Sequence, residues 1–456
     1  MKKIVAIGIL VALSALYISL SFAQSSEGVG SILITANVSP YHVYLDGQYW
    51  ALAESLEYVI SGVKPGQHLV TLRKDGHFDK RITISVVENS VTEIAATLNK
   101  GNADWSEGAR KVAAFRGHSL PVFSLEFSPN GRFALTGSAD HTARLWSVPD
   151  GKQVAMLSGH SDVVNTASFS PDGQYALTGS WDHTAKLWSV PDGKEVAALS
   201  EHTRGLSSAV FSCDGRYVLT ASADNTAKLW RVPEGTLVKT LAGHSNWISS
   251  IAFSPVGKYA ITGSFDNTAK LWSVPEGNLV YTLTGHSLWI NSVAFSPDGM
   301  YALTGSDDKT AKLWSIPDGR CVVTLTGHSN SIWPIAFSPD GSYAVTGSDD
   351  GTAKLWSIPD GICIKTLNGH KDFVTSLAFC PTGMYMLTGS RDSTAKLWSV
   401  PEGACVKTLD LPGLVYDAKF SPEGRYILIS NADDWRSGNG VTPPEGYVAT
   451  LFECAG

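Results

Sequence analysis

Short apolar runs separated by polar turns recur along most of the chain. In the stretch 243–283, apolar and β-branched positions form runs at 248–253, 259–262, 268–274 and 279–283. Pro, Gly and an Asp-Asn pair interrupt these runs. Runs of this length with such punctuation predict four short strands joined by tight turns, which is an antiparallel meander.

The meander returns every 42 residues. Seven copies carry a His at the start of the unit, an Asp before the third strand and a Leu-Trp pair within that strand. One such sheet cannot bury both of its faces, whereas copies stacked around an axis bury both and leave only short edges. The pattern therefore predicts an all-β fold, a β-propeller, over residues 109–456.

The units resemble the WD-repeat family in their Gly-His pair, their turn Asp and their strand-three Trp. The resemblance implies a hydrogen-bonded set of four side chains in each blade. Trp can only donate, Asp only accepts, and His and Thr bridge them. The expected members are His118, Thr136, Asp140, Trp146, His160, Thr178, Asp182, Trp188, His202, Thr220, Asp224, Trp230, His244, Thr262, Asp266, Trp272, His286, Thr304, Asp308, Trp314, His328, Thr346, Asp350, Trp356, His370, Thr388, Asp392 and Trp398.

The same residue types also serve in catalytic and metal sites. An active site is normally singular, with individually tuned pKa values, whereas this set recurs in seven near-identical copies. We therefore expect scaffold residues, no enzyme activity, no cofactor and no bound metal. A propeller enzyme would need a singular cluster that breaks the repeat.

The repeat degenerates after the seventh copy. Runs at 415–420 and 425–430 reproduce strands one and two. Leu411-Pro412 replaces the Gly-His pair, and the Trp is absent. The turn acid is either Asp433 or Asp434, because a one-residue deletion leaves the alignment open.

Two runs could each supply the fourth strand of the last blade. The run 447–452, which follows a Pro-Pro-Glu-Gly turn, resembles a fourth strand, and so does the run 111–115 before the first Gly-His. An N-terminal strand that completes the last blade would remove an open edge. Eight sets of strands one to three favour eight blades, with one fourth strand left over. Seven blades with an appended hairpin is the alternative.

Residues 30–99 lack the 42-residue unit. Short runs between Asp-Gly and Pro-Gly turns predict a small all-β sandwich with strands at 31–36, 42–45, 57–60, 68–73, 82–87 and 92–98. This module resembles the PEGA domain in its Val-Tyr-Leu-Asp-Gly run, its Pro-Gly turn and a Gly-His where that family prefers Gly-Tyr. Leu52-Ala53-Glu54-Ser55 stands where the name-giving tetrapeptide of that family would be.

The first 23 residues predict an export signal peptide. Lys2 and Lys3 precede an apolar stretch over 4–20, and Ser21-Phe22-Ala23 places small residues at the −3 and −1 positions of a cleavage site. We expect an exported chain, periplasmic or secreted, without a transmembrane span once the signal is removed. An uncleaved N-terminal membrane anchor is the alternative. A polar linker is expected at 100–108.

The net charge narrows the possible partners, and the cysteine spacing bears on disulfide formation. The net charge is −7 and no basic stripe is present, which argues against nucleic acid. Cys321, Cys363 and Cys405 occupy one repeat position on neighbouring blades. We expect free thiols there, because a disulfide needs Cα atoms within about 7 Å.

Positions that differ among the copies can carry specificity. At the start of strand one and just before the turn Asp, several copies carry large aromatic residues, which commonly anchor interfaces. By the alternation of a meander, these positions share the face of the Gly-His and Asp turns. The expected partner-binding residues are Phe123, Trp181, Trp247, Phe265, Trp289, Trp333, Phe373 and Tyr416. Packing of these rings over neighbouring turns is the alternative.

Two acids precede the turn Asp in consecutive copies. Asp307 and Asp349 are either an acidic patch that favours a basic partner or simply solvated charges, and we expect the latter. The sequence as a whole favours a non-catalytic protein–protein interaction scaffold of the cell envelope or exterior, which binds a protein or peptide on that face. A carbohydrate or cell-wall binding module, with an envelope glycan as partner, is the alternative.

Overall fold

The computed structural model describes residues 29–36, 41–46, 48–53, 55, 57–73, 80–88, 90–96, 105, 108–432 and 447–454. These residues form strands and turns, and they contain no helix that is long and apolar enough to cross a membrane. The predicted signal peptide, 1–23, lies outside the described residues.

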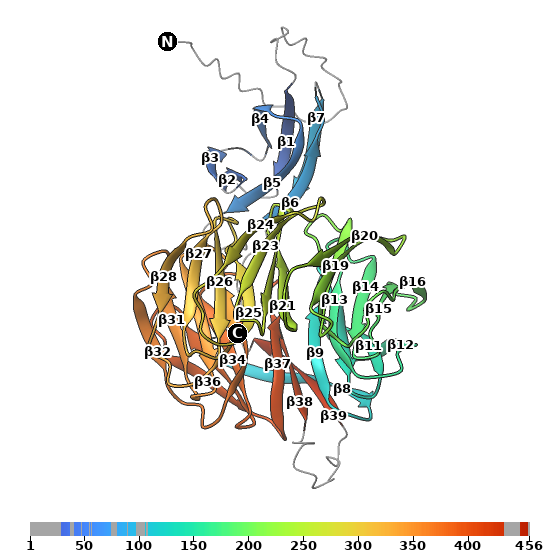
Figure 1. The fold of residues 1–456 in the computed structure, drawn as a ribbon, viewed down its shortest axis with the longest axis vertical. Coiled ribbons are helices and arrows are strands. Elements are labelled where there is room, and N and C mark those ends of the chain that lie inside the picture. Colours follow the sequence, from blue (N-terminus) through green and yellow to red (C-terminus); the bar gives the residue numbers. More distant parts are fainter. Residues whose placement is uncertain are drawn as a thin grey trace.

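The N-terminal strands form two small sheets with a shared core. One sheet has the order β4 (Glu57–Val63), β1 (Gly30–Ala36), β7 (Val91–Ala96), and the other β3 (Gln48–Ala53), β2 (Tyr41–Leu45), β5 (Gly66–Arg73), β6 (Lys80–Val86) (Figure 1). Ile32 and Ile60 of the first sheet are buried together with Val43 and Leu72 of the second. The predicted sandwich is confirmed, and it contains one strand, β3, that was not predicted.

The rest of the chain forms eight four-stranded sheets, the blades, around a common centre (Figure 1). The innermost strands contact one another in a closed ring, from β9 through each following blade to β37 and back to β9. All strands within a blade are antiparallel. The all-β propeller prediction is confirmed.

The first four blades, each from the inside outward, are β9 (Val122–Phe127), β10 (Phe133–Ser138), β11 (Thr142–Ser147) and β12 (Gln153–Ser158); β13 (Val164–Phe169), β14 (Tyr175–Ser180), β15 (Ala185–Ser189) and β16 (Glu195–Leu199); β17 (Leu206–Phe211), β18 (Tyr217–Ser222), β19 (Thr226–Arg231) and β20 (Thr236–Ala242); β21 (Ile248–Phe253), β22 (Tyr259–Ser264), β23 (Ala269–Ser273) and β24 (Leu279–Leu283).

The last four blades are β25 (Ile290–Phe295), β26 (Tyr301–Ser306), β27 (Ala311–Ser315) and β28 (Cys321–Leu325); β29 (Ile332–Phe337), β30 (Tyr343–Ser348), β31 (Ala353–Ser357) and β32 (Cys363–Leu367); β33 (Val374–Phe379), β34 (Tyr385–Ser390), β35 (Thr394–Ser399) and β36 (Cys405–Asp410); β37 (Leu414–Phe420), β38 (Tyr426–Ala432), β39 (Tyr447–Cys454) and β8 (Ala109–His118).

Each blade is buried against its neighbours. Leu135 and Leu145 of blade 1 pack in one core with Val164 and Trp188 of blade 2, and the same arrangement follows around the ring. The turn between strands one and two holds a glycine with positive φ, for example 70° at Gly173, where a side chain would be strained. The core therefore lies between blades rather than inside any one of them.

The eighth blade joins the two ends of the propeller. β39 pairs with β38 on one side and with β8 on the other. Eight blades, the favoured number, are confirmed. The assignment of 447–452 as a fourth strand was wrong, because this run is the third strand and β8 is the fourth, so that no strand is left over. Asp433 and Asp434 lie outside the described residues.

Blade 8 replaces the hydrogen-bonded set by apolar side chains. Phe452 lies opposite Ile427 as Trp146 lies opposite Ala134 in blade 1. Ile429 takes the place of the Thr, and the buried Leu411 packs in the same cluster as Ile429 and Phe452. Replacing the Trp and the Thr together leaves neither of these two polar groups without its partner, which makes that change nearly neutral.

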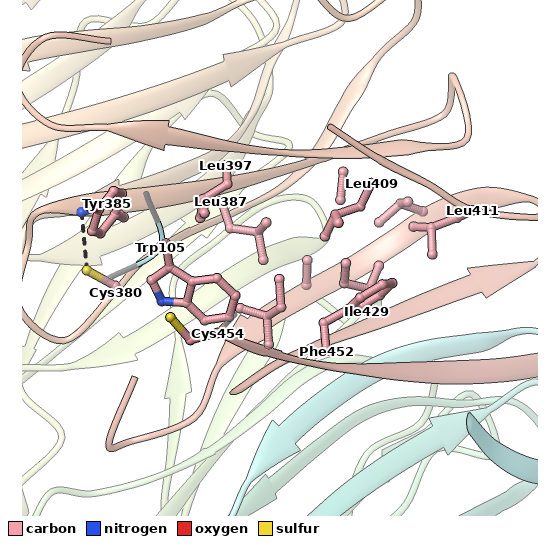
Figure 2. Close-up of a cluster of buried hydrophobic side chains, with 14 residues drawn as sticks. Trp105, Cys380, Tyr385, Leu387, Leu397, Leu409, Leu411, Ile429, Phe452 and Cys454 are labelled. Carbon is pink, nitrogen blue, oxygen red and sulfur yellow. Dashed lines mark hydrogen bonds between the residues drawn. The ribbon is translucent and has the colours of Figure 1, made fainter. Parts of the chain in front are cut away.

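Trp105 anchors the chain to the propeller just before β8 begins. Its side chain is fully buried between blades 7 and 8 beside Cys380 and Cys454 (Figure 2). Its indole N–H donates to Gly424 O at 3.1 Å, and its ring meets that of Phe420 edge-on. The segment predicted as a polar linker, 100–108, thus contributes a side chain to the propeller core.

We predict that Trp105→Ala lowers the free energy of unfolding of the propeller by about 3–5 kcal/mol, because it leaves a cavity between blades 7 and 8. Chemical denaturation followed by tryptophan fluorescence measures this change. The control is Trp181→Ala, which removes a ring that is 44% exposed and should cost far less. Equal losses in the two variants would contradict the anchoring role.

Candidate functional site

Seven blades contain the same chain of hydrogen bonds. In blade 1, the Trp146 indole N–H donates to Thr136 Oγ1 at 2.9 Å, Thr136 Oγ1 lies 2.7 Å from His118 Nε2, and His118 Nδ1 lies 2.8 Å from Asp140 Oδ2. In the other six blades these distances are 2.8–3.0, 2.7–2.9 and 2.7–3.0 Å. Because an ionised Asp only accepts, His Nδ1 carries the proton and Nε2 accepts the Thr hydroxyl.

Burial and hydrogen bonding fix the charges of these sets. Burial lowers the pKa of His118, although Asp140 acts in the opposite direction. Burial by itself would raise the pKa of Asp140, but hydrogen bonds with His118 and Thr142 outweigh it and hold that pKa well below its usual range. The set in blade 1 therefore holds a neutral His and an ionised Asp at neutral pH.

The sets are closed to solvent. The seven His side chains are 0–1% exposed. Each turn Asp also accepts a backbone N–H from the Gly-His connection, as Asp140 does from Ser119 at 3.1 Å. Within the described part of the chain, no group of three or more His, Cys, Asp or Glu side chains could hold a metal ion. The sets tie the two loops of each blade together.

These bonds place the Gly-His connections and the Asp turns on one face of the propeller, called here the Gly-His face. On it, the N–H of the residue before each turn Asp donates to the carbonyl of the residue that precedes strand one. Phe265 donates to Trp247 and Asp307 to Trp289, both at 2.9 Å, and Trp181 donates to Val163 at 3.0 Å. The two residues joined by each of these bonds are called here a rim pair, and the rim pairs together form the rim of the Gly-His face.

Three of the predicted aromatic residues form a stack across blades 4 and 5, called here the aromatic ladder. The ring centroids of Trp247 and Phe265 are 6.0 Å apart, and those of Phe265 and Trp289 are 4.5 Å apart. In both pairs, the angle between the two ring planes is only 16°. Trp247 and Trp289, the two outer members of the stack, are 48% and 46% exposed, so the ladder is open to solvent.

The other predicted aromatic residues have separate partners. The Arg391 guanidinium lies 5.0 Å from the Phe373 ring centroid, and Phe123 meets Tyr416 edge-on at 5.0 Å. Among the described residues, Trp181 stacks with none of the predicted rings. The structure therefore brings together some of the predicted residues, but not all eight.

Phe123, Trp333 and Tyr416 occupy a different position from the ladder residues. In the other five blades, a polar side chain at this position of strand one donates to a backbone carbonyl of the next innermost strand. The donors are Asn165, Ser207, Ser249, Asn291 and Thr375. Phe123, Trp333 and Tyr416 thus stand where the other five blades carry a polar link between neighbouring innermost strands.

The expectation that Asp307 and Asp349 are simply solvated is corrected by their contacts. Asp307 Oδ1 accepts a hydrogen bond from Asn291 Nδ2 at 2.7 Å, and Asp349 Oδ2 accepts one from the Trp333 indole N–H at 3.1 Å. Both carboxylates are half-buried. Burial raises the pKa of Asp349, against the hydrogen bond from Trp333 and the charge of Arg391.

The innermost strands also carry an acid and a base that the sequence analysis missed. Glu126 accepts the Phe169 N–H at 3.2 Å, and burial raises its pKa to about 7. Lys419 lies 3.2 Å from Asp417, whose charge raises the pKa of Lys419. The signal was present in the sequence, since blades 2 to 7 carry small or apolar residues at this position: Ser168, Val210, Ala252, Ala294, Ala336 and Ala378.

Eight closed blades with seven His-Thr-Asp-Trp sets define a WD-repeat β-propeller, preceded here by a small β-sandwich. The profile of the family described as the IFT122 first beta-propeller matches residues 89–357, well over half of the chain, and the chain belongs to this family. The profile of the WD domain, G-beta repeat, matches residues 361–399. The PEGA domain profile matches residues 29–102, which confirms the predicted resemblance.

Similar proteins share short stretches with this chain. It is 38% identical over 48 residues to eukaryotic translation initiation factor 3 subunit I of Aspergillus niger, which covers 10% of this chain and 14% of that protein. It is 54% identical over 41 residues to transcription initiation factor TFIID subunit 5 of Arabidopsis thaliana, which covers 9% of this chain and 6% of that protein. These matches are about one repeat long.

A solved structure extends the likeness to the whole propeller. The crystal structure of the computationally designed Ika8 protein has a TM-score of 0.66 and 25% sequence identity to this chain. The match covers 75% of this chain and 99% of that one. The comparison supports the fold of residues 109–454 as one closed unit.

We predict that acid destabilises the propeller. The pKa values of five of the set His residues lie below the ordinary 6.5, so the unfolded chain takes up protons first and stability falls as the pH drops below 6.5. The pKa values of all seven set Asp residues lie below the ordinary 3.8, so their contribution is present above 3.8 and lost as the pH falls through the lowered values.

Glu126 opposes this trend between its ordinary pKa of 4.5 and its folded pKa of about 7. Urea denaturation at a series of pH values measures the balance, with the steepest loss expected below pH 3.8. Glu126→Gln should make the loss between pH 7 and 4.5 steeper. A midpoint that stays constant down to pH 3 would show that the sets do not control stability.

Proposed function

We propose that this chain is a non-catalytic protein-interaction scaffold that binds a protein or peptide partner on the Gly-His face of its propeller. The observation that carries this proposal is the contrast between two groups of tryptophans. The seven set tryptophans are at most 3% exposed, whereas Trp181, Trp247, Trp289 and Trp333, all toward the Gly-His face, are 42–48% exposed. Exposed aromatic side chains of this size are common anchors of interfaces.

The hydrogen-bonded sets support a structural role rather than catalysis. A catalytic His must contact its substrate, and the His side chains of the sets are closed to solvent. Each set makes the same hydrogen bonds in each of seven blades. The residues that differ among blades, and can therefore carry specificity, lie at the rim.

The ladder geometry favours a protein partner over a glycan. Sugar-binding platforms use the open face of an aromatic ring. In the ladder, Phe265 is stacked on Trp247 on one side and on Trp289 on the other. Both faces of Phe265 are therefore covered, and the exposed apolar surface of Trp247 and Trp289 suits the side chains of a peptide.

Trp105 contacts the propeller on the face opposite the Gly-His face. β8 begins at Ala109, opposite Cys454, and Trp105 is bound at Gly424 in a strand one–two turn. These turns lie on the face opposite the Gly-His face.

We further propose that the chain is exported to the periplasm or the exterior, where the scaffold joins envelope components. Support comes from the two lysines, the apolar stretch and the small residues of the first 23 positions. Mass spectrometry of the protein expressed in its native host should show a mature chain that begins at Gln24. A chain that retains residues 1–23 would favour the uncleaved anchor.

We predict that the triple variant Trp247→Ala, Trp289→Ala, Trp333→Ala folds but loses the partners that the wild-type chain captures from envelope extract. Truncation of interface anchors costs about 2 kcal/mol or more each. The matched control is Met156→Ala, Leu279→Ala, Ile364→Ala, which removes side chains that are 42–48% exposed from the outermost strands. A triple variant that retains every partner would contradict the proposed face.

A further inference from the structure

The rim pairs of the Gly-His face differ strongly around the ring. Blades 1 and 3 carry small pairs, Pro121 with Ala139 and Gly205 with Ala223. Blades 4 to 7 carry large or charged pairs: Trp247 with Phe265, Trp289 with Asp307, Ser331 with Asp349, and Phe373 with Arg391. Blade 2 carries one further large pair, Val163 with Trp181, which the small pair of blade 3 separates from the others. Among the described residues, large or charged pairs are therefore continuous over the four neighbouring blades 4 to 7, called here the arc.

One end of the arc, the aromatic ladder, offers apolar surface and donors. Among the described residues, neither the Trp247 nor the Trp289 indole N–H has a hydrogen-bond acceptor, and both side chains are nearly half exposed. Phe265 is stacked between the two indoles. Exposed aromatic rings that carry N–H donors match an extended peptide, which presents carbonyl groups between its side chains.

The middle of the arc is acidic, and its acids are held in place. Asn291, which is only 7% exposed, fixes Asp307, and the Trp333 indole fixes Asp349. Asp307 and Arg391 both lie within electrostatic reach of Asp349, since each perturbs its pKa. The neighbouring Asp308 and Asp350 are ionised in their sets, because hydrogen bonds hold their pKa values low.

The cations nearby do not balance these charges. Arg391 lies over the Phe373 ring, and Lys309 is exposed in its turn. Asp308 and Asp350 are only 8% exposed and are bonded within their sets. Asp307 and Asp349 are therefore the carboxylates that blades 5 and 6 offer to a partner. A partner that brings a cation to this part of the arc gains charge complementarity.

We propose that the arc over blades 4 to 7 binds an extended segment of a protein partner, which places a Lys or Arg side chain against Asp307 and Asp349 while an apolar side chain packs on the aromatic ladder. The inference rests on the proposed function and adds the sign of charge and the conformation of the partner. The carboxylates accept the charge-assisted hydrogen bonds of the cation, and the indole N–H groups donate to the carbonyls of the segment.

A library of random short peptides, selected on the full-length chain, tests this proposal. We expect the selected peptides to share a basic residue at a fixed spacing from an apolar one. Fluorescence anisotropy of labelled selected peptides then gives the affinity for each variant, and circular dichroism checks that each variant is folded.

Asp307→Asn combined with Asp349→Asn should weaken binding by about tenfold or more, and high salt should weaken binding to the wild type. These changes remove charge but keep an acceptor oxygen for Asn291 and Trp333. The matched control is Asp318→Asn combined with Asp360→Asn, which removes the same charge from the strand three–four turns of the same two blades. That control should bind as the wild type does.

The outcomes separate this inference from the proposed function. If Trp247→Ala with Trp289→Ala abolishes binding but the Asn variants and salt have no effect, the basic partner is wrong and the binding face stands. If neither pair of substitutions affects binding, the face itself is wrong. Selected peptides that lack basic residues, or a library that yields no binder, would overturn the inference.

Discussion

The burial of each blade between its two neighbours is the constraint on which the rest of the structure depends. A four-stranded meander has two apolar faces, and here the leucines of one blade pack against the Trp of the next. The stack is stable only if it closes. β8 closes it by pairing with β39, and Trp105 packs across the joint between blades 7 and 8. The hydrogen-bonded sets then tie the loops of seven blades at one face, so that the scaffold is complete without any contribution from the rim.

Because the blades and their hydrogen-bonded sets form the scaffold, the side chains of the rim can differ from blade to blade. Because the repeat places Trp247 and Trp289 at the same position of adjacent blades, one intervening ring, Phe265, is enough to join them in a stack. The same spacing places Asp307 and Asp349 on adjacent blades, and their hydrogen bonds orient them. A rigid frame with variable loop ends is a common way to build a binding surface.

Much of the fold could be predicted because it repeats. The period fixed the four strands of a blade, and β21 and β24 begin and end where the runs at 248–253 and 279–283 do. The eighth blade was harder, because Phe452 and Ile429 replace the residues that mark a blade, and a Pro-Pro-Glu-Gly turn imitates the one before a fourth strand. β3 was missed although 49–53 is a continuous apolar run, because the run does not alternate, and Trp105 was missed because it lies alone in a polar segment.

Less of the candidate site could be predicted. The aromatic residues that differ among copies were visible in the sequence, but their contacts depend on the angle between blades, which no single repeat encodes. The sequence therefore grouped Trp333 with Trp247 and Trp289, although Trp333 lies further along strand one and bonds Asp349. It also left Asn291 unnoticed, because a polar residue at that position is common to most copies.

The central claim is that this protein works through the Gly-His face of a closed eight-bladed propeller. Hydrogen–deuterium exchange of the mature chain, alone and with a bound partner or selected peptide, tests it most directly. The account predicts slower exchange at 245–250, 263–268, 287–292 and 305–310, with no change in the strand one–two turns at 254–258 and 296–300. Protection confined to those turns, or to the outermost strands, would contradict it.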